Sequence, residues 1–221
     1  MASIGIMTFL HNDNFGSSLQ AYALQRVLRD MGQEAEHIDY RPDRAEKMRN
    51  LLASGNSPKL VLEGMRKKKV KAAQSGAREK SKAIPLFYEK RMKLSPVCRN
   101  QRELKRQCAR YDTLICGSDQ IWNPVWLNAA YFLPFSAPAQ RKISYAASLG
   151  VRTLPSERKQ RKIRTWMEGF DAVSVREAEG AALLEKITGK KPEVMPDPVC
   201  LLTRREWEKL ALPAPAGKAF V

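Results

Sequence analysis

The chain has 221 residues, of which 43% are hydrophobic, and its formal net charge at pH 7 is +16. This length is enough for one large domain or two small ones, and the hydrophobic fraction is enough for a packed core. The sequence predicts neither a membrane span, since its apolar runs fall short of the roughly 18 residues needed, nor a signal peptide, since its first residues lack a basic start followed by an apolar stretch.

The positive charge is concentrated in one segment. Of the 39 Lys and Arg, 21 lie between residues 41 and 110, together with only six of the 23 Asp and Glu. This confinement, with no nucleic-acid motif beside it, argues against a general nucleic-acid-binding domain, and we expect no specific nucleic-acid partner. The run RKKKVK at 66–71 is usually a solvated face, although it could also contact anionic lipid head groups or a charged polymer.

The cysteines predict a reducing compartment. Cys98, Cys108, Cys116 and Cys200 form no CxxC pair, and the two histidines lie far from them in the sequence. We therefore expect free thiols in the cytoplasm and no metal site.

A strand–helix–strand unit is predicted at the start of the chain. The strands are expected at 3–9 and 35–40, with a helix between them that Gly32 ends. We expect Ser17 to cap this helix, with Gln20 three residues later as in a capping box. Its apolar face is formed by Leu24, Val27, Leu28 and Met31. Such units build parallel sheets.

Residues 41–110 interrupt this pattern. They are basic, helix-prone and weakly patterned, which predicts an insertion of surface helices, of which 102–111 returns to the sheet. A buried strand at 113–116 and a loop at 117–123 follow.

The second half alternates strands and helices. Strands are predicted at 141–148 and 171–175, and a last strand and turn at 192–202. Helices are predicted at 156–170, 177–189 and 203–211, with Ser156 and Thr203 as caps. The whole order predicts an α/β fold: a Rossmann-like, open, mostly parallel sheet flanked by helices, with the basic helical insertion. We interpret residues 1–221 as a single domain. The unfinished strand pattern KAFV predicts that 212–221 begin the link to a C-terminal domain that is missing from this chain.

Polar clusters follow four of the predicted strands. They are HNDNFG at 11–16, GSDQ at 117–120, the pair at 176–177 and PDP at 196–198. In an open parallel sheet the carboxyl ends of the strands share one edge, where ligands bind. We therefore expect the four clusters to lie along the same rim.

The first cluster is placed between a strand and the N-terminus of a helix, which favours anions. Asn12, Asn14 and Ser17 could bind hydroxyls or oxyanions, Gly16 permits close backbone approach, and His11 could move a proton near neutral pH. The alternative is an Asx-type turn with a satisfied histidine. The pattern is neither GxGxxG nor a Walker loop, so a dinucleotide or nucleoside triphosphate is not indicated.

The second cluster combines a carboxylate with hydroxyl and amide groups at a strand end. Its residues are Gly117, Ser118, Asp119 and Gln120. Asp119 could act as a base toward a sugar hydroxyl, or it could cap a following helix. Trp122 and Trp126 could stack on a sugar ring, but a place in the core is the alternative, and we favour it for Trp126.

The last two clusters are less specific. Arg176 could form a local ion pair with Glu177 or hold a carboxylate or phosphate in bidentate fashion. Asp197, between two prolines, is either a rigidly held ligand or part of a helix-entry turn.

Seven segments in this order resemble the polysaccharide pyruvyl transferase family. They are GIMTFLHNDNFGSSLQAYALQRVLRDMG, HIDYRP, CGSDQIWNP, YFLPF, KISYAASLG, DAVSVRE and DPVCLL. The resemblance implies two Rossmann-like domains facing a cleft, as in GT-B glycosyltransferases, with this chain as the N-terminal half.

The resemblance also implies a reaction. Pyruvate would move from phosphoenolpyruvate, a donor substrate and not a cofactor, onto two hydroxyls of a saccharide or lipid-linked saccharide in cell-envelope polysaccharide synthesis. The residues on the acceptor side would be Asn12, Asn14, Ser118, Asp119 and Gln120. The enzyme would work in the cytoplasm, and residues 66–71 could contact the inner face of the membrane. A nucleotide-sugar glycosyltransferase of the same architecture and a non-enzymatic polyanion-binding module are the alternatives.

Overall fold

The structure, a computed structural model, describes residues 2–12, 14–54 and 77–211. The expected membrane contact at 66–71 and the expected link at 212–221 lie outside these residues. For 77–82 only the backbone is described.

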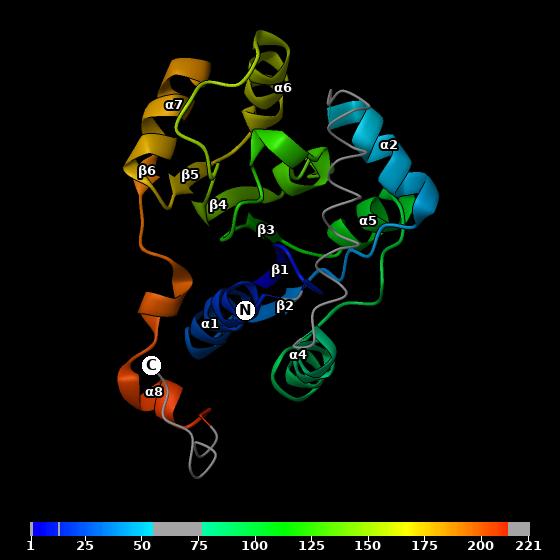
Figure 1. The fold of residues 1–221 in the computed structure, drawn as a ribbon, viewed down its shortest axis with the longest axis vertical. Helices are drawn as coiled ribbons and strands as arrows, with labels where there is room; N and C mark the ends of the chain where they lie inside the picture. Colours follow the sequence, from blue (N-terminus) through cyan, green and yellow to red (C-terminus); the bar gives the residue numbers. More distant parts are fainter. Residues whose placement is uncertain (1, 13, 55–76, 212–221) are drawn as a thin grey trace.

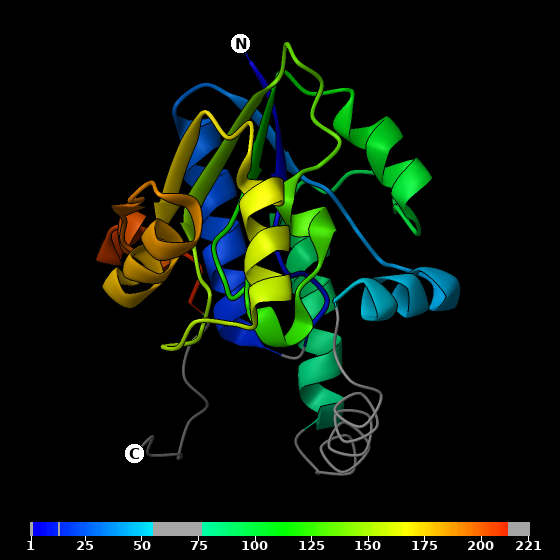
Figure 2. The same ribbon diagram turned by 90° about the horizontal axis from the view of Figure 1, so that it is seen from above.

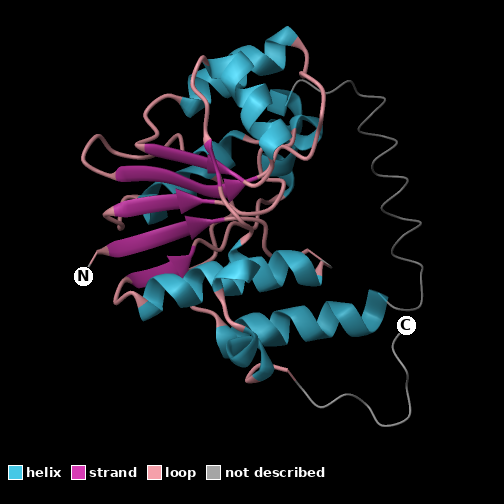
Figure 3. Cartoon of the chain, turned by 90° about the vertical axis from the view of Figure 1, so that its left-hand side faces the viewer, coloured by secondary structure: helices cyan, strands magenta, loops and turns pink. Residues whose placement is uncertain are grey.

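The fold is built on one sheet of six parallel strands in the order β2-β1-β3-β4-β5-β6. The strands are β1 (Ser3–Met7), β2 (Glu34–His37), β3 (Thr113–Cys116), β4 (Arg141–Ala147), β5 (Ala172–Val175) and β6 (Glu193–Val194). Figure 3 shows them running side by side in one direction, with helices above and below. The predicted α/β class and open Rossmann-like sheet are thus confirmed. The strand and turn expected at 192–202 are the two-residue strand β6 and a 3-10 turn.

Helices cover both faces of the sheet. They are α1 (Phe15–Asp30), α2 (Arg44–Ser54), α4 (Ala77–Arg91), α5 (Gln101–Cys108), α6 (Glu157–Met167), α7 (Ala178–Thr188) and α8 (Arg204–Glu208), with 3-10 turns η1 (Pro124–Trp126), η2 (Ala129–Phe132) and η3 (Pro198–Leu201). Figures 1 and 2 show α1 on one side of the sheet and α6 on the other. No helix in the described ranges combines the length and the apolar character of a transmembrane segment.

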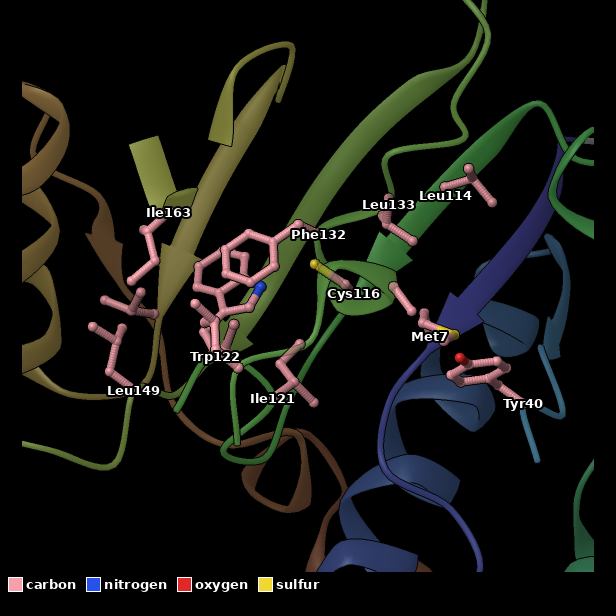
Figure 4. Packing of buried hydrophobic residues seen from close by; sticks show 14 of the residues in the cluster. Met7, Tyr40, Leu114, Cys116, Ile121, Trp122, Phe132, Leu133, Leu149 and Ile163 are labelled. Atoms are coloured by element: carbon pink, nitrogen blue, oxygen red, sulfur yellow. The ribbon is translucent and has the colours of Figure 1, made fainter. Parts of the chain in front are cut away.

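The larger core lies on the face opposite α1. Trp122 is fully buried there and stacks on Phe132 at a ring-centroid distance of 5.2 Å, and its indole N–H donates to the Tyr131 carbonyl (Figure 4). A smaller cluster of aliphatic residues packs between the sheet and α1, and it includes Ile6, Leu24 and Ile115. Burial of these side chains fixes the sheet, and with it the rim where the strands end.

The prediction that Ser17 caps the first helix was wrong. The helix begins three residues earlier than that cap implies, at Phe15, and its cap is Asn14, whose side-chain oxygen accepts from the Gly16 N–H at 2.9 Å. Ser17 therefore lies in the first turn of α1, and the expected capping box with Gln20 does not form. At the other predicted caps, Thr203 makes a full capping box, whereas Ser156 makes no side-chain cap hydrogen bond.

The basic segment is not only an insertion of surface helices. On α4, Ile84 and Tyr88 are buried, and the Tyr88 hydroxyl lies 2.9 Å from the Ser18 hydroxyl on α1. Residues after α4 also run beside β2, with parallel bridges from His37 to Leu94 and from Tyr40 to Cys98. The segment thus extends the edge of the sheet and brings Tyr88 to the rim.

Candidate active site

The site begins with the turn after β3, which Gly117 makes possible. Its φ is 121°, a conformation that side chains with a Cβ rarely adopt, and an added Cβ would lie 2.1 Å from the Tyr145 carbonyl oxygen. The chain therefore passes close to β4 at this point. This close approach sets the position of the next two residues, Ser118 and Asp119.

Ser118 forms hydrogen bonds to four other segments at the rim. It is fully buried. Its N–H donates to the Gln20 side chain, its carbonyl accepts from Thr8, and its hydroxyl lies 2.9 Å from the Ala146 carbonyl and 3.2 Å from the Asp197 carboxylate. Ser118 thus joins the ends of β1, β3 and β4 to the PDP turn.

The next residue, Asp119, has a left-handed backbone conformation, with φ of 67°. One carboxylate oxygen accepts from the Gln120 N–H at 2.7 Å, and the other accepts a short hydrogen bond from the Ser17 hydroxyl. The carboxylate is half-buried and lies at the N-terminus of α1. A non-glycine residue in this conformation is uncommon, and such residues cluster at functional sites.

The asparagines of the opening loop take different positions. The Asn12 amide donates to the Ser17 hydroxyl at 3.0 Å, which extends the chain of hydrogen bonds from Asp119. Its side-chain oxygen is buried and has no hydrogen-bond partner among the described residues. The Asn14 side chain caps the helix: its oxygen accepts from the Gly16 N–H. This hydrogen bond forms the Asx-type turn considered above.

His11 meets a residue that the sequence did not single out. Its Nε2 lies 2.8 Å from the carboxylate of Asp39, which follows β2 and also binds Arg41 through two hydrogen bonds of 2.8 Å. The His11 ring packs edge-on against Tyr88, with ring centroids 5.2 Å apart. Sequence reasoning missed both of these partners of His11, Asp39 and Tyr88; the one available signal was an aspartate at the end of a predicted strand.

Arg176 is held by two carboxylates. Its Nη1 donates to Asp197 at 2.9 Å and its Nε donates to Glu177 at 3.1 Å. Burial would lower the Arg176 pKa, but these two neighbours outweigh it and raise the pKa above its ordinary value. A ligand anion would have to share or displace them. The Asp197 side chain also accepts from the Val199 N–H, as expected for a turn entry.

Only one of the two tryptophans lies in the core. Trp122 is in the core, whereas 49% of Trp126 is exposed, and its indole N–H donates to the carbonyl of Gln120. The expectation that Trp126 is a core residue was therefore wrong. The core on this face is filled by Trp122 and Phe132, and Trp126, in η1, lies outside it beside Gln120.

The strand order places these residues at the crevice where ligands bind in such sheets. The chain runs from β1 outward to β2 and then returns to β3 on the other side of β1, so the strand order reverses between β1 and β3. Doubly wound proteins bind ligands at this switch point, beyond the carboxyl ends of the strands. Asn12 and Ser17 follow β1 and Asp119 follows β3, so their hydrogen-bonded chain spans it.

The charges and side chains do not suggest a metal centre. In the described part of the chain, no group of three or more His, Cys, Asp or Glu is arranged to hold a metal ion. The four cysteines are free, and only Cys200 is exposed.

Comparison with known proteins identifies the family. The family model described as "Polysaccharide pyruvyl transferase" matches residues 14–218, nearly the whole chain. Searches of curated proteins and of solved structures returned no match. The chain therefore belongs to the polysaccharide pyruvyl transferase family, which makes it a transferase.

Proposed function

We propose that this member of the polysaccharide pyruvyl transferase family transfers pyruvate from phosphoenolpyruvate to a sugar, and that the described rim binds the sugar acceptor. The product is a cyclic ketal on a cell-envelope polysaccharide or glycolipid. The observation that carries the proposal is the Asp119 carboxylate at the switch point, which accepts from the Ser17 hydroxyl, while that hydroxyl accepts in turn from the Asn12 amide. The enzyme acts in the cytoplasm, where phosphoenolpyruvate is made.

The reaction requires two hydroxyls to lose their protons. The enol carbon of the donor takes up one proton, the first hydroxyl adds to the neighbouring carbon, and the phosphate leaves with its bridging oxygen. The second hydroxyl then closes the ketal. Of the two hydroxyl protons, one balances the new methyl group and the other the released phosphate. A carboxylate within hydrogen-bond reach of a hydroxyl is a suitable base, and Asp119 has this role in the proposal.

The charge at the rim supports an acceptor and not the donor as its ligand. Asp119, Asp197 and Glu177 are carboxylates, and the guanidinium of Arg176 is already bound to the last two. A polyol offers hydroxyl donors to such oxygens, whereas a donor with a carboxylate and a phosphate would be repelled by them. The cations for the donor are expected on the facing C-terminal domain.

The test is acceptor-dependent release of phosphate from phosphoenolpyruvate by the full-length protein. Asp119→Asn keeps the size of the side chain and removes the base, so we expect the turnover number to fall about 100-fold or more. The matched control is Asp30→Asn at the far end of α1, where an exposed carboxylate pairs with Arg26. Turnover should be unchanged in the control. Equal turnover in Asp119→Asn and the wild type would remove Asp119 from the mechanism.

A further inference from the structure

Asp39 is a buried carboxylate that the reaction described above does not use. Only 3% of its side chain is exposed, and both of its oxygens are bound: one by His11 Nε2 and Arg41 Nε, and the other by Arg41 Nη2, each at 2.8 Å. A buried carboxylate is costly unless it is paired and hydrogen-bonded. This one is fully paired, and one of its partners is the only histidine on the rim.

The backbone of Asp39 is fixed independently of these side chains. Its N–H donates to the Ser95 hydroxyl at 3.0 Å, and its carbonyl accepts from the Cys98 N–H at 2.8 Å. Both partners belong to the segment that runs beside β2. The carboxylate is therefore anchored to the edge of the sheet, and His11, in the opening loop, is positioned by it.

The His11 ring is restrained on more than one side. Its residue has a left-handed backbone, with φ of 57°, and its ring packs against Tyr88 while its side chain keeps 22% exposure. Tyr88 in turn lies close enough to Asp119 and Asp39 to sense their charges. Burial is the main cause of the raised pKa of Tyr88, and these two negative charges raise it further. Asp39, His11, Tyr88 and Asp119 thus form one neighbourhood at the rim.

We propose that Asp39 is a positioning residue that holds His11 as a second proton acceptor for the sugar. With Nε2 bound to the carboxylate, the proton of neutral imidazole is on Nε2, and Nδ1 carries the lone pair. Nδ1 takes the proton of one sugar hydroxyl as that oxygen bonds to the donor carbon, while Asp119 takes the other. The Nδ1 proton then passes to the released phosphate, and the Asp119 proton replaces the one that the enol carbon takes up. The Asp39 charge stabilises the transient imidazolium, as an aspartate does for the base in serine proteases.

This inference rests on the proposed function, but its first test does not need activity. Long-range ¹⁵N–¹H correlation on the wild-type chain reads the tautomer of His11 above neutral pH. Protonation on Nε2 is the expected result, and protonation on Nδ1 would overturn the proposal. The measurement is made without substitution, so a variant that fails to fold does not affect it.

The second test uses Asp39→Asn in the full-length protein. We expect kcat to fall by about tenfold to a thousandfold, less than for loss of a base itself, with KM for the acceptor unchanged. The matched control is Asp43→Asn, which removes an exposed carboxylate that accepts from the Glu46 N–H, and which should leave kcat unchanged. If Asp39→Asn folds and retains wild-type kcat, or alters only KM, the proposal is wrong. If the wild type itself does not turn over phosphoenolpyruvate, the proposed function fails while the tautomer still reports the coupling of Asp39 to His11.

Discussion

His37, the last residue of β2, makes the stability of the fold depend on pH. Its side chain is fully buried and its Nε2 donates to the Ala21 carbonyl of α1 at 2.9 Å, while its Nδ1 has no hydrogen-bond partner within the described residues. Burial lowers the pKa of His37 from 6.5 to about 4, and the hydrogen bond to Ala21 offsets only part of this. The ring is therefore neutral in the folded protein across a range in which the unfolded chain is protonated.

The sign and size of the effect follow from this difference in pKa. Between pH 6.5 and pH 4 the unfolded chain binds a proton at His37 that the folded protein does not, so the free energy of unfolding falls as the pH is lowered. A difference of about 2.5 pH units corresponds to about 3 kcal/mol. This contribution to the free energy of unfolding is fully present above pH 6.5, and it is lost progressively as the pH falls toward 4.

The variant His37→Gln removes the titration while keeping an amide that can donate to Ala21. Urea unfolding of both proteins at several pH values between 7.5 and 4.5 gives the two pH profiles. The difference at pH 7.5 measures the packing cost of the substitution, and the change in that difference at lower pH isolates the titration. We expect the wild type to lose about 2 to 3 kcal/mol more than the variant on acidification. Parallel profiles would show that His37 does not titrate with a lowered pKa and would refute the reasoning.

Two further predictions concern the rim. Gly117→Ala would place a Cβ 2.1 Å from the Tyr145 carbonyl oxygen in addition to straining φ, so we expect the free energy of unfolding in urea to fall by more than about 2 kcal/mol. Gly189→Ala is the control, because Gly189 has a positive φ but open space around it, and its free energy of unfolding should fall by about 1 kcal/mol. Equal losses in the two variants would contradict the close approach at Gly117. Trp126→Ala should raise the acceptor KM in steady-state kinetics several-fold without loss of stability, whereas Trp122→Ala should cost about 3–5 kcal/mol. An unchanged acceptor KM in Trp126→Ala would exclude that side chain from sugar binding.

The sequence predicted the sheet and its rim because those features are encoded locally. Alternating strands and helices give parallel strands, and parallel strands bring their carboxyl ends to one edge. The four polar clusters after β1, β3, β5 and β6 were therefore expected to share a rim, and they do. Which clusters touch depends on the strand order, which no local pattern contains. The contact of Asp119 with Ser17 joins residues 102 positions apart in the chain.

The predictions that failed were choices between equivalent neighbours. Asn14 and Ser17 are both good caps, and in the structure Asn14 is the cap while the Ser17 hydroxyl binds Asp119. Trp122 and Trp126 are four residues apart, and it is Trp122 that stacks on Phe132 in the core. Asp39 was missed for a related reason, since its bond to His11 spans 28 positions. In each case a distant contact, invisible in a local window, decided the outcome.

The N-terminus of α1 shows what such a contact changes about function. From the sequence, the free N–H groups and the dipole of this helix favoured an anionic ligand, so a donor oxyanion and a sugar hydroxyl were equally suited to the opening loop. In the folded protein the anion is supplied by the chain itself, because the Asp119 carboxylate binds the Ser17 hydroxyl in the first turn and Asn14 caps the Gly16 N–H. A second anion there would meet a carboxylate in place of a free helix end. This arrangement supports the proposal that the ligand of the rim is a neutral group that donates hydrogen bonds, as an acceptor sugar does.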